Sequence, residues 1–122
     1  MSEKMSLFPG RDSKGRRMGE LSIPEHTMEA LDNYFLRGYE PGSFLASVLT
    51  NNLYRAVGSA DSANRHAIYE IVKWLTHSDD VVPHNSFGTS EQVADWLNDN
   101  NNIRTKFVDK VEKEYIWNTL KA

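Results

Sequence analysis

The most continuous apolar pattern in the chain lies in residues 43–57. Its apolar side chains recur at spacings of three, four and seven, which places them on one face of a helix. They are Phe44, Leu45, Val48, Leu49, Leu53, Ala56 and Val57. Pro41 and Gly42 form a turn sequence before this stretch, and Ser43 stands where a helix N-cap is expected. We therefore expect one helix over residues 43–57, with the other helices packed around it.

Four further helices are predicted, over about residues 24–37, 62–77, 90–98 and 103–120. Local signals at the helix ends support these bounds. Pro24 suits a first turn, because its missing N–H would have no helical partner there. Gly38 suits the left-handed residue that follows a helix. Asp61 is a good N-cap, and Thr89 with Gln92 three residues later forms a capping box.

Two polar stretches separate the later helices. Residues 78–88 combine aspartates, proline, asparagine and glycine, which is typical of an irregular loop. Residues 98–102 hold five polar side chains that compete with the helical backbone for hydrogen bonds. Alternation of the β type is absent apart from a few residues near Val81. The predicted fold is all-α, a compact bundle of about five helices in a single domain over residues 21–122.

Residues 1–20 differ from the rest in composition and charge. They hold glycines, serines and few apolar groups, so we expect a flexible arm. Their five basic and three acidic side chains give a net charge of +2, whereas the remainder of the chain carries −5. An acidic body does not favour broad contact with duplex nucleic acid, which needs clustered Lys and Arg.

Features that the sequence lacks exclude several classes of protein. The chain has no cysteine, which excludes disulfides and thiolate metal sites. No stretch approaches the roughly 20 apolar residues of a membrane span, and the N-terminus lacks the apolar core of a signal peptide. We therefore expect a soluble cytoplasmic protein without membrane contact.

The arm contains one candidate binding motif. Met5, Ser6, Leu7 and Phe8 resemble part of the short peptide by which bacterial replication proteins bind the sliding clamp. Ser6, Leu7 and Phe8 match that pattern, whereas Lys4 stands in place of glutamine and Met5 in place of leucine. The alternatives are an arm whose Leu7 and Phe8 pack against the domain and a disordered end.

Nucleic acid is a second candidate partner of the arm. Its basic side chains would contact phosphates, and a tyrosine, Tyr34 or Tyr39, would stack on a base. The basic residues are Arg11, Lys14, Arg16 and Arg17. The alternative is a solubilising tail, because the charge density is modest.

The best candidate metal ligands lie at the end of the helix predicted over residues 62–77 and in the loop that follows it. His77, Asp79, Asp80 and His84 are of the types that suit zinc or manganese. Their spacing matches no known ligand motif, and the alternative is a solvated loop. The expectation is no bound metal or other cofactor.

Four tyrosines are candidates for a partner-binding surface: Tyr34, Tyr39, Tyr54 and Tyr115. Exposed tyrosine is enriched at interfaces. The alternative is that they pack in the core, as the three tryptophans are expected to do. The sequence carries no nucleophile elbow and no phosphate-binding glycine loop, so we do not expect an enzyme.

Residues 23–97 resemble a family of small helical proteins from tailed bacteriophages. The resemblance rests on Ile23-Pro24, on Pro41-Gly42-Ser43-Phe44-Leu45, on Ala60-Asp61, on Trp74-Leu75, and on Gly88-Thr89 followed by Val93 and Trp96-Leu97. Family members often have Asn-Asp where this chain has Asn51-Asn52, and Trp where it has Phe87. The resemblance implies a viral origin and assigns no catalytic residue. Our hypothesis is a phage protein in the host cytoplasm that binds a host protein, either core machinery or an antiviral defence component, and blocks or redirects it.

Overall fold

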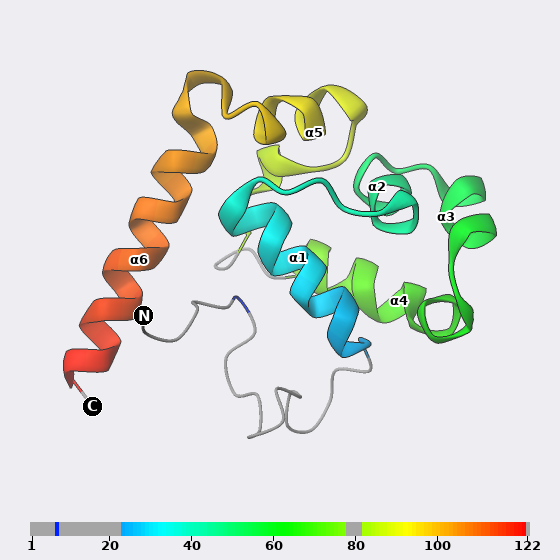
Figure 1. The fold of residues 1–122 in the computed structure, drawn as a ribbon, viewed down its shortest axis with the longest axis horizontal. Helices are drawn as coiled ribbons and strands as arrows, with labels where there is room; N and C mark the ends of the chain where they lie inside the picture. Colours follow the sequence, from blue (N-terminus) through cyan, green and yellow to red (C-terminus); the bar gives the residue numbers. More distant parts are fainter. Residues whose placement is uncertain (1–6, 8–22, 78–81, 122) are drawn as a thin grey trace.

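The computed structural model of the chain describes residue 7 and residues 23–77 and 82–121. Over these residues the fold is all-helical, as the sequence predicts, and contains six α-helices and no strand (Figure 1). The helices are α1 (Glu25–Arg37), α2 (Ser43–Leu49), α3 (Leu53–Ser59), α4 (Ser62–His77), α5 (Ser90–Leu97) and α6 (Ile103–Lys121). Two 3-10 turns, η1 (His84–Ser86) and η2 (Asn100–Asn102), precede α5 and α6 respectively.

The predicted helix ends are confirmed at Gly38, Asp61 and Thr89, whereas the predicted N-cap Ser43 is wrong, because Gly42 holds the N-cap position of α2 and Ser43 is its first helical residue. Gly38 adopts φ 70° after α1, and its N–H donates to the carbonyl of Tyr34. The Asp61 carboxylate accepts the backbone N–H of Asn64 at 2.7 Å at the start of α4. The Thr89 hydroxyl accepts the N–H of Gln92 at 3.1 Å and begins α5. These bonds join near neighbours, so they form as the sequence predicts.

The single helix predicted over residues 43–57 is wrong, because the chain breaks between α2 and α3. Asn51 adopts φ 65°, a left-handed conformation that asparagine tolerates. The side chain of Asn52 then caps α3 by accepting the N–H of Arg55 at 3.2 Å. In a continuous helix the carbonyl of Leu49 would accept from residue 53. Here it accepts the N–H of Gly88 at 2.6 Å, so a contact distant in sequence satisfies the end of α2.

The centre of the fold is α1 rather than the 43–57 stretch. Leu31, Tyr34 and Phe35 of α1 are fully buried. The ring of Phe35 lies edge-on to Trp74 of α4 and Trp96 of α5, with centroid distances of 6.3 Å and 6.1 Å. Helices α2, α4 and α5 surround α1, and α6 flanks it (Figure 1). The tryptophans Trp74 and Trp96 therefore belong to the core, as the sequence predicts.

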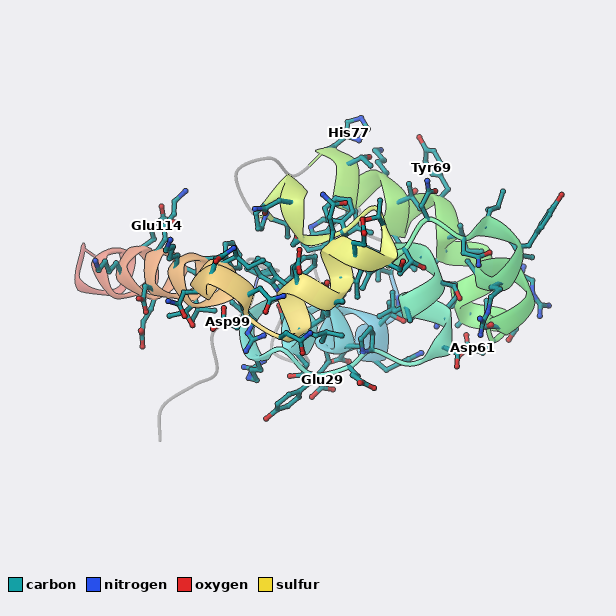
Figure 2. The ribbon with its side chains drawn as sticks, turned by 90° about the horizontal axis from the view of Figure 1, so that it is seen from above. Glu29, Asp61, Tyr69, His77, Asp99 and Glu114 are labelled. Carbon is teal, nitrogen blue, oxygen red and sulfur yellow. The ribbon has the colours of Figure 1, made fainter. Side chains whose placement is uncertain are left out.

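The last helix is anchored through its first turns. Phe107 packs on Trp96 with ring centroids 5.5 Å apart. Arg104 donates from Nη1 to the carbonyls of Trp96, at 2.6 Å, and Leu97, at 3.1 Å, at the end of α5. Asp99, with φ 55°, accepts the backbone N–H groups of Arg104 and Thr105 and caps α6. Beyond these contacts α6 extends past the rest of the domain (Figure 2).

Candidate protein-binding surface

Exposed large apolar side chains gather on α3 and α4. Among the described residues, six such side chains are exposed, and five of them lie on these two helices. They are Leu53 (65% exposed), Tyr54 (91%), Val57 (43%), Tyr69 (70%) and Val72 (41%). We call these five residues the α3–α4 surface. The sixth is Tyr39, in the turn between α1 and α2.

The break before α3 explains why its apolar side chains are exposed. Ala56 is the one buried residue of this helix. Leu53 and Val57 are four residues apart and share a face that adjoins Ala56. Because Asn51 and Asn52 reorient the chain, this face is only partly covered. The stripe expected to be core is therefore interrupted after Leu49, and on α3 only Ala56 stays buried while Leu53 and Val57 are exposed.

On α4 the exposed apolar side chains stand beside basic ones. Buried positions of α4 include Ala67, Ile71 and Trp74. Tyr69 projects outward from the helix, away from α1 (Figure 2). Val72 lies three residues on, and is its neighbour on the helix surface. The Nζ of Lys73 lies 5.9 Å from the centroid of the Tyr69 ring, within range of a cation–π contact.

A shallow hollow lies where α2, α3 and α4 meet. Its lining includes Val48, Ala56 and Ile68 together with Leu53 and Val72 of the α3–α4 surface. Its volume is about 60 Å³, far smaller than a typical small-molecule site. A more open hollow of about 470 Å³, lined mainly by polar groups, adjoins it along Leu53. The smaller hollow suits the tip of a side chain from another protein.

The four tyrosines that were candidates for a binding surface do not lie together in the structure. Tyr54 lies on the α3–α4 surface, and Tyr39 is exposed elsewhere. The prediction that Tyr34 belongs to a binding surface is wrong, because its side chain is fully buried and its hydroxyl donates to the carbonyl of Ser86 at 2.7 Å. Burial raises the pKa of Tyr34 far above its ordinary value, and the charge of Arg104 only partly opposes this. The side chain of Tyr115 lies outside the described residues.

Of the predicted arm motif, the structure describes Leu7. This side chain is 5% exposed and belongs to the core cluster. Its backbone N–H donates to Oδ1 of the buried Asp32 at 2.8 Å. This placement agrees with the alternative in which the arm packs against the domain, and clamp binding would require Leu7 to leave the core. Met5, Phe8, Arg16 and Arg17, with the arm's other basic side chains, lie outside the described residues, so clamp and nucleic-acid binding stay predictions.

Only part of the predicted metal loop is described. His77 is exposed at the end of α4, and its Nδ1 lies 3.0 Å from the carbonyl of Lys73. Asp79, Asp80 and the side chain of His84 lie outside the described residues. Among the side chains that the structure does describe, no group of three or more His, Cys, Asp or Glu residues could hold a metal ion.

Sequence reasoning missed most of the α3–α4 surface. It placed Leu53 and Val57 on the apolar face of the helix expected over residues 43–57, and did not single out Tyr69. One signal was available in the spacing of residues along α4. That spacing places basic and apolar side chains together on one helix face, namely Arg65, Tyr69, Val72 and Lys73. No comparable signal marked Leu53 and Val57, because their exposure depends on the break before α3.

No helix within the described part of the chain has the length and apolar character needed to cross a bilayer. Comparisons of the chain with protein-family models, with curated proteins and with solved structures found no match. The phage resemblance accordingly stays a prediction that rests on the quoted residues.

Proposed function

We propose that this protein works by binding another protein through the α3–α4 surface. The observation that carries the proposal is the gathering of five of the six exposed large apolar side chains, among the described residues, on two adjacent helices. Leu53 of α3 and Val72 of α4 line the same hollow, so the two helices contribute to one surface. Large exposed apolar patches are uncommon on monomeric proteins and often mark interaction sites. Two of the five residues are tyrosines, a type enriched at interfaces and among the residues that dominate binding energy.

The local architecture supports this role. Tyr69 and Val72 are one turn apart on α4, the 16-residue helix whose opposite face is held in the core by Ile71, Trp74 and Leu75. Side chains presented from a packed helix lose less freedom on binding than side chains on a mobile loop. Leu53 adds a third apolar contact beside the hollow on α3.

The target class follows from the sequence resemblance. A small tailed-phage protein acts in the host cytoplasm, so the proposed partner is a host protein, either core machinery or an antiviral defence component. The chain carries no recognisable catalytic motif, which favours blocking or redirecting the partner over modifying it.

The experiment is affinity purification of the tagged full chain from bacterial cells, compared with a variant that carries both Leu53→Asp and Tyr69→Ala. Both side chains are mostly exposed, so the variant should keep its helical circular dichroism and its melting temperature within a few degrees. We expect a stoichiometric partner with the unmodified chain and at least a tenfold lower yield with the variant.

Tyr39→Ala is the matched control, because Tyr39 is 58% exposed and lies outside the α3–α4 surface. It should recover the partner in full yield. Absence of any stoichiometric partner would contradict the binding function. A partner retained by the double variant would place the interface elsewhere.

A further inference from the structure

The α3–α4 surface lies in a weakly basic part of an acidic chain. Residues 53–77 hold three basic and two acidic side chains, a net charge of +1, whereas the whole chain carries −3. The stretches on either side are acidic. Residues 23–52 hold one basic and four acidic side chains, and residues 78–102 hold five acidic side chains and no Lys or Arg. The charge of this surface therefore differs in sign from that of its neighbours in sequence.

Helix geometry places the basic groups of α4 beside its exposed apolar groups. Arg65, Tyr69, Val72 and Lys73 fall on one side of a helix with 3.6 residues per turn. Glu70 lies three residues before Lys73, so the two side chains are neighbours on the helix surface, at the edge of this face away from Val72. The exposed face of α4 therefore combines Tyr69 and Val72 with two positive charges, and its one carboxylate, Glu70, lies at the edge farthest from the hollow.

The guanidinium of Arg65 is held at the end of α3. Its Nη2 donates to the backbone carbonyl of Ala60, the residue that follows α3, at 3.2 Å. The residue is nevertheless exposed. Its remaining N–H groups can donate to a carboxylate, because a guanidinium carries five such donors. Arg65 thus presents a fixed positive charge at the junction of the two helices.

We propose that the α3–α4 surface binds an acidic amphipathic helix of the partner protein. The apolar face of that helix would pack on Leu53, Val57 and Val72, with one side chain in the hollow between α2, α3 and α4. Its carboxylates would lie beside Arg65 and Lys73. Recognition of this kind places an amphipathic helix in an apolar groove and uses flanking charge for selectivity. The inference rests on the proposed binding function and specifies the partner's chemistry.

Two other occupants fit the surface less well. In a two-fold dimer the same patch meets itself, which would bring the basic groups of both copies together. Nucleic acid binding depends on phosphate contacts by clustered Lys and Arg, whereas this surface is centred on Leu53, Val57 and Val72. An acidic protein segment satisfies both the apolar and the basic groups.

The test is a selection from a displayed library of helix-forming peptides, about five turns long, with randomised surface charge, against the immobilised full chain. Peptides that also bind the variant with Leu53→Asp and Tyr69→Ala are removed. We expect the enriched peptides to be net negative, with apolar residues at spacings of three and four. Enrichment of neutral or basic peptides would overturn the inference. So would a selection in which every enriched peptide also binds the variant with Leu53→Asp and Tyr69→Ala.

A charge reversal checks the assigned contact. Lys73→Glu should weaken binding of an enriched peptide about threefold to tenfold at low salt, with a smaller effect at high salt. Lys106→Glu, an exposed position on α6, is the control and should leave affinity unchanged. If Lys73→Glu and Lys106→Glu weaken binding equally, the effect comes from the overall charge of the protein. That result would contradict a local contact between Lys73 and the peptide.

The two proposals fail in different ways. If cells yield a surface-dependent partner but the selected peptides are not acidic, the inference about charge is wrong and the binding function stands. If cells yield no partner, the binding function itself fails, whatever the library returns.

Discussion

The indole N–H of Trp96 donates a 3.0 Å hydrogen bond to the backbone carbonyl of Tyr34, across 62 residues of sequence. Both side chains are fully buried, and their ring centroids are 6.4 Å apart. The hydroxyl of Tyr34 reaches further, to the carbonyl of Ser86. Tyr34 thereby joins α1 to both α5 and the turn before it, which is why it belongs to the core and not to a binding surface.

Replacement of Tyr34 by phenylalanine tests this role. The change removes the donor to the buried carbonyl of Ser86. This loss should lower the free energy of unfolding by about 1–3 kcal/mol, which urea denaturation measures. Tyr39→Phe is the control, since Tyr39 is exposed. The control should change stability by no more than about 0.5 kcal/mol. Equal effects of the two substitutions would contradict the structural role of Tyr34.

Replacement of Gly38 and Gly58 by alanine should change the free energy of unfolding in opposite directions. At Gly38, φ is +70°, and a Cβ would meet the Arg104 guanidinium that packs against it. We expect Gly38→Ala to lower the free energy of unfolding by about 1–2 kcal/mol. Gly58 lies within α3 with no atom near its Cβ position. Gly58→Ala should therefore stabilise the protein by about 0.5–1 kcal/mol.

Thermal denaturation of both glycine variants checks this pair of predictions. A neutral Gly38→Ala substitution would show that Arg104 moves aside without loss. In that case the contact between Arg104 and the end of α5 contributes little to stability.

The cap of α6 should make stability depend on pH in the acid range. Hydrogen bonds from the side chain and backbone of Thr105, then from the backbone of Arg104, hold the pKa of Asp99 below its ordinary value. A carboxyl of this kind stabilises the fold above its unfolded pKa, about 4. That stabilisation is lost as the pH falls through the lower, folded value. Asp99→Asn removes the titration and keeps a residue that tolerates the positive φ.

We therefore expect the unmodified protein to be more stable than Asp99→Asn at neutral pH, with the difference shrinking below about pH 4. Melting temperatures measured from neutral to strongly acidic pH would show this. A difference that stays constant or grows toward low pH would contradict the role of Asp99 as an ionised cap.

The side chain of Leu7 belongs to the core cluster, so this residue is part of the fold. Leu7→Ala leaves a cavity in the core and should lower the free energy of unfolding by about 2–4 kcal/mol. Deletion of residues 1–20 also removes the N–H that donates to the buried Asp32. The deletion should therefore cost more, about 3–6 kcal/mol. Urea denaturation measures both losses.

Deletion of residues 1–5 is the matched control, because it keeps Leu7, and we expect only a small loss. This comparison matters for tests of arm-dependent binding. Loss of a partner on deletion of residues 1–20 does not separate binding from a weakened fold, whereas loss on deletion of residues 1–5 would assign the contact to those five residues.

The sequence by itself determined the elements whose signals are local. Gly38, Asp61 and the Thr89–Gln92 pair bond to groups no more than about four residues away, so their effect can be read without the fold. The all-α class and the ends of α1, α4 and α5 follow from them. Asn51-Asn52 was an equally local stop signal, but the apolar spacing across it indicated a continuous helix, and the number of helices was underestimated for that reason.

Only the tertiary structure decided which apolar side chains are covered. Leu53, Val57 and Val72 have the same helical spacing as core residues, yet they are exposed because no other described element packs over them. Leu7 and Tyr34 are buried in the core cluster, where Asp32 of α1 and Ser86 of η1, 25 and 52 residues away in sequence, accept hydrogen bonds from their polar groups. Burial depends on neighbours brought together by the whole fold, whereas periodicity records only the position of a residue around its own helix.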